Sequence, residues 1–256
     1  MDAFFIGLHQ PSDGKHFSAA CISINRLRGA KGRKAPLPAK LKRVLIDSAA
    51  FTELNLHCRY RHSVKEYADD ARPWCLDGRV VAIVAQDYMC EPFMLAKTGL
   101  TVAEHQRLTI ERYDELHAYW FGALGMKTPI MPVLQGWDAD DYVRHLEAYG
   151  ARLTTGMWVG VGSVCKRQSN PAAILAIFQK LKRARPDLRF HAFGVKLAAL
   201  NHPELRALIS TADSTAWSYR ARRQRGDDIK AKGWSDVRPN DWRHAKAFER
   251  KVWGRA

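Results

Sequence analysis

The stretch Val44-Leu45-Ile46-Asp47-Ser48-Ala49-Ala50-Phe51 is a short apolar run that ends in an acid and opens into a turn of small residues. The stretch Ser210-Thr211-Ala212-Asp213-Ser214-Thr215-Ala216-Trp217 has the same arrangement near the end of the chain. Asp87 follows the run Val80–Gln86 in the same way. Apolar runs of this length predict buried strands. Each of these carboxylates is therefore expected where a strand opens into a loop.

Outward from these stretches, short apolar runs alternate with longer amphipathic ones, a pattern typical of a parallel sheet or barrel. The eight runs that we interpret as strands are Phe4–Gly7, Ala20–Ile24, Val44–Asp47, Val80–Ala85, Pro129–Leu134, Met157–Val161, Phe190–Val195 and Thr211–Ala216. Eight such units predict an α/β fold, a TIM-like (β/α)8 barrel.

Helix signals lie between the predicted strands. Thr101 and Glu104 form a capping box, in which each side chain can satisfy the other residue's backbone N–H. Asp138 and Gly150 bound a predicted helix over Ala139–Tyr149. Asn170-Pro171 is expected to open the next helix.

The length of 256 residues suits a single barrel domain over 1–256. No apolar run approaches the roughly 20 residues needed to cross a bilayer, and the start is too short and too acidic for a secretory signal. We therefore expect a cytoplasmic protein without a membrane partner. The five cysteines show no zinc spacing, so reduced structural thiols and no metal are expected.

The net charge of +15 is unevenly distributed along the chain. Residues 1–46 hold nine Lys and Arg against two acidic residues, and residues 218–256 hold twelve against five. Residues 47–217 are close to neutral, with twenty basic and nineteen acidic residues. Basic clusters bind phosphates by releasing counterions, whatever the nucleotide sequence. We therefore expect nucleic acid as a partner; a charged surface that only aids solubility is the alternative.

Two segments carry most of this charge. Residues 26–43 are rich in Arg, Lys, Gly and Pro and are predicted to form an exposed basic loop. Residues 218–256 are predicted to form a basic extension that ends in a helix over Asp241–Trp253. The residues expected to contact nucleic acid are Arg33, Lys34, Lys42, Arg43, Arg220, Arg222, Arg223 and Arg225.

Polar residues and glycines follow the predicted strands, where the reactive groups of a βα barrel lie. A carboxylate can stabilise or trap an oxocarbenium-like state at an anomeric carbon, and a second acid can move a proton. A third acid and an amide can read the edge of a purine. These residues therefore suit glycosidic-bond chemistry, although strand-end acids occur in other βα enzymes and can simply cap turns.

These blocks resemble a known superfamily. Val44–Phe51 resembles the Asp-Ser-Gly-Gly-Phe motif of the tRNA-guanine transglycosylases, and Val133–Trp137 resembles their Val-Gln-Gly segment. Val159–Val164 is similar to their Gly-Gly-Leu turn, Phe193–Val195 to their Met-Gly-Val strand end, and Asp213 with the later Arg220 to their nucleophile stretch. The blocks span about residues 44–223 and most resemble the DNA-modifying branch, the DpdA-type 7-deazaguanine transglycosylases.

The resemblance implies a role for each matched residue. Asp213 corresponds to the nucleophile that attacks C1′ and holds the sugar covalently, and Asp47 to an acid that assists proton transfer. The residues implied to bind the base are Asp87, Gln135, Gly136, Gly160, Val161, Gly162 and Ser48. The implied reaction exchanges guanine in a polynucleotide for a free 7-deazaguanine, 7-cyano-7-deazaguanine or a relative, with no other cofactor.

The chain departs from the tRNA enzymes in three ways, of which the missing zinc ligands and the shorter chain favour DNA as the substrate. Ala49-Ala50 replaces Gly-Gly after Asp47, and no cysteine follows Cys165, so the three-cysteine zinc site of the tRNA enzymes cannot form. The alternatives are base exchange on tRNA, hydrolysis of a modified nucleoside, and a barrel that binds nucleic acid without catalysis. A helper protein or a homodimer stays open. His191 is expected to be a core histidine, and Glu91 has no assigned role.

Overall fold

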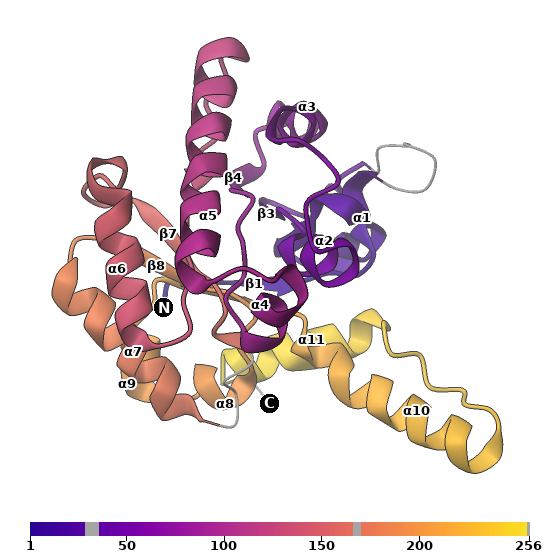
Figure 1. Cartoon of the computed structure of the whole chain (residues 1–256). Coiled ribbons are helices and arrows are strands. Elements are labelled where there is room, and N and C mark those ends of the chain that lie inside the picture. Colours follow the sequence, from indigo (N-terminus) through magenta and orange to yellow (C-terminus); the bar gives the residue numbers. More distant parts are fainter. Residues whose placement is uncertain (29–35, 166–169, 255–256) are drawn as a thin grey trace.

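The computed structural model describes residues 1–28, 36–165 and 170–254, which form a nearly closed barrel of parallel strands surrounded by helices (Figure 1). The predicted TIM-like fold is confirmed. The strands of the described residues are β1 (Ala3–Gly7), β2 (Ala19–Ser23), β3 (Arg43–Asp47), β4 (Val80–Val84), β5 (Ile130–Met131), β6 (Val133–Leu134), β7 (Trp158–Val161), β8 (Arg189–Ala192) and β9 (Thr211–Ser214).

The predicted strand over 129–134 is divided by Pro132 into β5 and β6. Proline has no N–H to donate to the ladder, but the Pro132 carbonyl still accepts from Gly160 N–H at 2.8 Å. The first half pairs with β4 and the second half with β7. The sheet order β5-β4-β3-β2-β1-β9-β8-β7-β6 therefore begins and ends in one segment of chain, which brings its two edges together.

Helices follow the strands and cover the outside of the barrel. Those of the described residues are α1 (Ile24–Arg28), α2 (Ala50–His57), α3 (Val64–Cys75), α4 (Pro92–Thr98), α5 (Val102–His117), α6 (Ala139–Tyr149), α7 (Pro171–Ala184), α8 (Leu197–Leu200), α9 (Pro203–Leu208), α10 (Tyr219–Lys232) and α11 (Trp242–Val252). None of them is long and apolar enough to cross a bilayer. The predicted caps at Thr101, Asp138 and Asn170 are confirmed.

Alternation along the strands divides the apolar core in two. One set of side chains, including Phe4, Ile6 and Val161, packs between the strands and the helices. A smaller set, including Phe5 and Leu45, fills the barrel interior. Because the strands are parallel, all their carboxyl ends open at the same end of this interior.

The two basic segments are more structured than expected. The segment 26–43 begins inside α1 and includes the buried Leu27, Leu37 and Leu41, so the prediction of an exposed loop is wrong for these parts. In the C-terminal extension, α10 projects from the body, whereas α11 returns to pack against β1 (Figure 1). The predicted helix over Asp241–Trp253 is confirmed as α11, capped by Asp241.

Candidate active site

Three predicted carboxylates lie at the carboxyl end of the barrel. Asp47 is the last residue of β3, Asp213 lies in β9, and Asp87 follows β4. Asp87 and Asp213 are buried, at 6% and 7% exposure, and Asp47 is partly buried. The charge of Asp213 raises the pKa of Asp47, and the charge of Asp47 raises the pKa of Asp87. The structure therefore gathers acids that are far apart in the sequence.

Asp87 is held by side chains from three other parts of the chain. The Ser48 hydroxyl donates to its Oδ1 at 3.2 Å, and the Gln135 amide nitrogen donates to its Oδ2. Tyr60 bonds the Asp87 backbone twice, donating to the carbonyl at 2.9 Å and accepting from the N–H at 3.0 Å. Asp87, Ser48 and Gln135 thus form one polar cluster, and their role in binding the base stays a prediction. Tyr60 was missed because no local pattern marks it.

Burial changes the protonation of two of these acids. It raises the pKa of Asp47 to about 6, and the Asp213 charge adds to the increase against a hydrogen bond from Ala49 N–H. Burial and the Asp47 charge raise the pKa of Asp87 to about 7, although Gln135 and Ser48 oppose them. Because carboxyl groups with such values change charge near neutral pH, they can exchange protons with a substrate.

Asp213 is fixed through one carboxylate oxygen. Gly194 N–H donates to Oδ1 at 2.8 Å, and Nε2 of His191 lies 3.4 Å from the same oxygen. No hydrogen bond of Oδ2 is found among the described residues. The contact with His191 is unexpected, since the sequence suggests only a core histidine. The sequence does contain a signal for this contact. Side chains alternate along β8, so His191, which lies between the outward-facing Phe190 and Ala192, points into the barrel.

Gly160 in β7 and Gly162 just after β7 make room for neighbouring side chains. A Cβ on Gly162 would lie 2.2 Å from the Gln135 amide nitrogen, and one on Gly160 would lie 2.3 Å from the Phe193 ring. Gly136 likewise has no space for a side chain, because Asp141 packs against it. The Val161 side chain belongs to the outer core, so only its backbone could face a ligand. The turn therefore shapes the cluster by its lack of side chains.

Ser163 orients the Gln135 amide. Its hydroxyl accepts from Cys90 N–H at 2.9 Å and lies 2.6 Å from Gln135 Oε1 and 2.8 Å from Glu91 Oε2. Because Oε1 faces the Ser163 hydroxyl, the amide nitrogen faces Asp87. Sequence reasoning placed Ser163 in a matched block without a role, and Glu91 without any. Both are buried and connect α4 to the β7 turn.

Ala49 adopts a left-handed backbone, with φ of 68° and ψ of 21°. In this conformation its N–H donates to Asp47 Oδ2 at 3.0 Å. A Cβ in this region costs about 1–2 kcal/mol, which glycine avoids. Ala49 stands at the first of the two positions where the resembled motif has Gly. The turn therefore keeps the left-handed backbone that favours glycine, although the residue is alanine.

Basic residues from both ends of the sequence meet beside the site. Arg222 donates to the Ser218 hydroxyl at 2.7 Å, and that hydroxyl lies 2.9 Å from His9 Nε2. Burial, with the charges of Arg222 and Arg26, lowers the pKa of His9 to about 4. His9 follows the carboxyl end of β1, so these arginines lie at the same end as Asp213.

The other predicted nucleic-acid contacts are distributed over both ends. Arg220, Arg223 and Arg225 are exposed on α10, which begins after β9. Lys42 and Arg43 lie at the amino end of β3, so the structure does not bring them to the aspartates. Arg33 and Lys34 lie outside the described residues.

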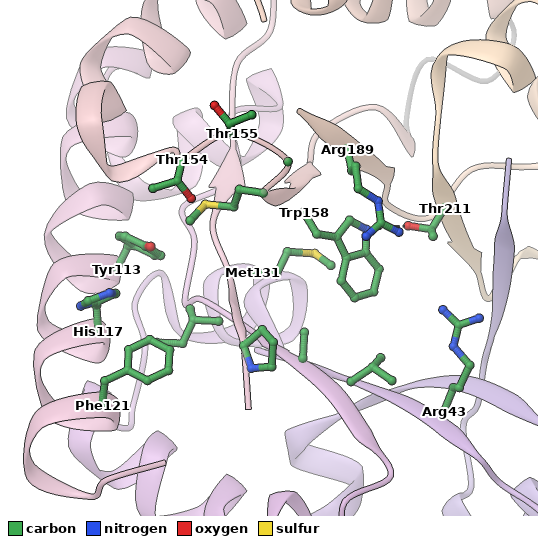
Figure 2. A pocket seen from close by; sticks show the side chains of 16 residues that line it. Arg43, Tyr113, His117, Phe121, Met131, Thr154, Thr155, Trp158, Arg189 and Thr211 are labelled. Atoms are coloured by element: carbon green, nitrogen blue, oxygen red, sulfur yellow. Dashed lines mark hydrogen bonds between the residues drawn. The ribbon is translucent and has the colours of Figure 1, made fainter. Parts of the chain in front are cut away.

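A cavity of about 680 Å³ lies at the opposite end of the barrel (Figure 2). Its wall includes Tyr113 and Phe121 from α5 and the segment after it, Met131 and Trp158 from the strands, and Arg189 at the rim. None of the predicted catalytic or base-binding residues lines it. The groups needed for chemistry therefore lie in the polar cluster and not in this cavity.

The carboxyl end combines Asp213, whose Oδ2 has no hydrogen bond among the described residues, with Asp47 and Asp87, whose pKa values are about 6 and about 7. The Gln135 amide lies beside them in a fixed orientation. No curated protein matches the chain. The family model described as DpdA, DeoxyPurine in DNA protein A, matches residues 1–233, from β1 to the end of α10. The chain therefore belongs to the DpdA family, DeoxyPurine in DNA protein A.

Proposed function

We propose that the protein exchanges guanine in DNA for a free 7-deazaguanine base, such as 7-cyano-7-deazaguanine. The observation that carries the proposal is the arrangement of Asp213, Asp47 and Asp87 at one end of a barrel of this family. A nucleophile, a proton carrier and a base reader are the groups that such an exchange requires. The family description, which refers to deoxypurines in DNA, supports DNA over tRNA.

In the first step, Oδ2 of Asp213 attacks C1′ while the bond from C1′ to N9 of guanine breaks. The electron pair goes to N9, and Asp47 gives a proton to the departing base. In the second step, N9 of the incoming base attacks C1′, its proton returns to Asp47, and Asp213 is released. A pKa of about 6 makes both forms of Asp47 accessible near neutral pH. Protons and electrons balance without another reactant.

Asp87 is proposed to read the base through its N1–H and its exocyclic amine, both of which donate to a carboxylate. Gln135 lies beside Asp87, and its amide is suited to the neighbouring carbonyl of the base. Guanine and 7-deazaguanines share this edge and differ in the five-membered ring. One cluster can therefore hold the departing and the arriving base in turn.

Duplex DNA must present its guanine by base flipping, which costs a few kcal/mol. Arg26, Arg222 and the exposed arginines of α10 supply positive charge near the site. Phe51 and Phe93 are exposed at the starts of α2 and α4, and Tyr219 at the start of α10. Exposed aromatic rings next to cations are suited to stacking with bases that leave the duplex.

The test is incubation of the purified protein with 7-cyano-7-deazaguanine and either duplex DNA or tRNA, followed by mass spectrometry of the nucleosides. We expect the deazaguanine deoxynucleoside from DNA and no modified nucleoside from tRNA. Asp213→Ala serves as the control and should yield neither. A product in tRNA alone would contradict the proposed substrate, and a product in neither would contradict the reaction.

A further inference from the structure

His191 lies directly beneath the proposed nucleophile and is fully buried in β8. Its imidazole is enclosed by three aromatic rings, with centroids at 4.5 Å for Phe193, 5.7 Å for Trp158 and 6.2 Å for Phe5. All three contacts are edge-to-face, a favourable geometry for aromatic pairs. The ring therefore has little freedom to turn, and its two nitrogens keep fixed neighbours.

Those neighbours form a chain of hydrogen bonds with a defined direction. The Trp158 indole N–H, which can only donate, bonds the Thr211 hydroxyl oxygen at 2.8 Å. The Thr211 hydroxyl lies 2.8 Å from Nδ1 of His191. Among the described residues, the proton of the Thr211 hydroxyl has no acceptor other than Nδ1, so the hydroxyl donates to Nδ1 and Nδ1 is an acceptor. Nε2 then carries the proton of a neutral imidazole and faces Asp213 Oδ1 at 3.4 Å.

The carboxylate end of the chain requires the same tautomer. An ionised Asp213 can only accept, so a deprotonated Nε2 would leave two acceptors facing one another. An imidazolium would place a second donor on Thr211, whose own proton has no other acceptor among the described residues. The contacts with Thr211 and with Asp213 therefore both require the neutral imidazole with its proton on Nε2.

We infer that His191 is a positioning residue for Asp213, held as the Nε2–H tautomer by the Trp158–Thr211 pair. The inference rests on the proposed function and deepens it. His191 and Gly194 both bond Oδ1, so the carboxylate is oriented with Oδ2 toward the sugar. Hydrogen bonds of catalytic groups tighten when substrate binds.

The chain of hydrogen bonds from Trp158 to Asp213 runs through the barrel interior. Trp158 and Thr211 line the cavity at the amino end, where Figure 2 shows the indole nitrogen directed toward the Thr211 hydroxyl. Asp213 opens at the carboxyl end. The nucleophile is thus oriented by groups that a substrate at the carboxyl end does not touch.

Matched substitutions test this role. His191→Phe keeps a ring but removes the donor, whereas His191→Gln keeps an N–H near the position of Nε2. We expect His191→Phe to lower kcat for base exchange about 100-fold, the scale of a misplaced reacting group, with KM for base and DNA unchanged within twofold. The kcat of His191→Gln should be at least about tenfold higher than that of His191→Phe. Thr211→Val should lower kcat about tenfold, and Thr211→Ser should restore it.

A kcat unchanged in His191→Phe, or no better in His191→Gln than in His191→Phe, would overturn the inference. Thermal unfolding and circular dichroism of each variant show whether it is folded.

A second measurement does not depend on catalysis. Long-range proton–nitrogen spectra of the wild type labelled with ¹⁵N-histidine show which nitrogen of each ring carries a proton, and His191→Gln identifies the signals of residue 191. We expect a proton on Nε2 alone. A proton on Nδ1 overturns the inference even if base exchange itself is absent, so failure of the tautomer and failure of the proposed function are distinguished.

Discussion

The two ends of the barrel differ in what they enclose. The amino end holds a cavity of about 680 Å³ whose wall is mostly apolar, with Arg43 and Arg189 at its edge. At the carboxyl end, Asp87 and Asp213 are buried and bond donors from other parts of the chain, and Asp47 bonds the N–H of Ala49 in the turn that follows it. This cavity and the carboxylates therefore lie at opposite ends of the strands.

This difference shows what a parallel barrel imposes. The strands start and finish together, so every residue that follows a strand reaches the same end. Asp47, Asp87 and Asp213 lie at the carboxyl ends of their strands, while the cavity at the amino end has a mostly apolar wall. The volume of a cavity is thus a poor guide to this molecule's chemistry, and the variants below compare the two ends.

The largest effect is expected from the nucleophile. Asp213→Asn keeps the size and the Gly194 contact but removes the negative charge, so base exchange should fall by at least about 10⁴-fold. Arg189→Gln at the amino end is the matched control and should stay within about twofold. The measurement is initial-rate incorporation of labelled base into DNA. Equal losses in both variants would remove the distinction between the two ends.

Base binding should depend on pH through Asp87. The base needs an ionised acceptor, and below a pKa of about 7 the carboxyl must first release a proton. The affinity for free 7-cyano-7-deazaguanine should therefore fall about tenfold per unit as pH drops below 7, and level off above 8.

Calorimetric titration from pH 5 to 8 measures this dependence. Asp87→Asn should bind more weakly, with little dependence on pH. An affinity that rises as pH falls would contradict the assignment of Asp87 as the base reader.

A smaller effect, on DNA affinity, is expected to distinguish the basic residues of α10 from those at the amino end of the barrel. Arg220→Gln with Arg223→Gln alters exposed side chains on α10 for which no hydrogen bond is found among the described residues, whereas Arg222 donates to the Ser218 hydroxyl. We expect DNA affinity to fall about tenfold, and the slope of log affinity against log salt to decrease by about 2. Lys42→Gln with Arg43→Gln at the amino end should leave both within error. An unchanged slope in the α10 variant would exclude α10 from the DNA interface.

The smallest effect concerns two left-handed residues. Ala49 near Asp47 has φ of 68°, and Gly156 before β7 has φ of 76°. Ala49→Gly should raise the free energy of unfolding by up to about 1 kcal/mol, because the steric cost exceeds the added chain entropy. Gly156→Ala should lower it by about 1 kcal/mol. Denaturant titrations measure both, and a destabilised Ala49→Gly would show that Ala49 is not strained.

Much of this arrangement could be predicted from the sequence. Strand ends are local features, so the positions of Asp47 and Asp213 and the capped helices follow from apolar runs and turn residues. The resemblance added roles for Asp87 and Gln135, which the structure places in contact. The division of one predicted strand into β5 and β6 could not be predicted, because apolar residues continue on both sides of Pro132.

Other parts of the site depend on contacts between distant residues. Tyr60 lies in a loop, yet it fixes the Asp87 backbone. Ser163 orients Gln135, and His191 reaches Asp213, only after three strands are placed side by side. The end of the barrel at which a basic residue lies also requires the fold, as Arg43 shows. Such pairings have no periodic signal in one sequence.

The most direct test of the central claim is to trap the covalent intermediate. The protein is mixed with duplex DNA without free base, quenched with acid, digested with protease and nuclease, and mapped by mass spectrometry. We predict a deoxyribose adduct on the peptide that contains Asp213, absent in Asp213→Asn and lost when 7-cyano-7-deazaguanine is added before the quench. An adduct on the peptide that contains Asp47, or guanine release without any adduct, would contradict the account.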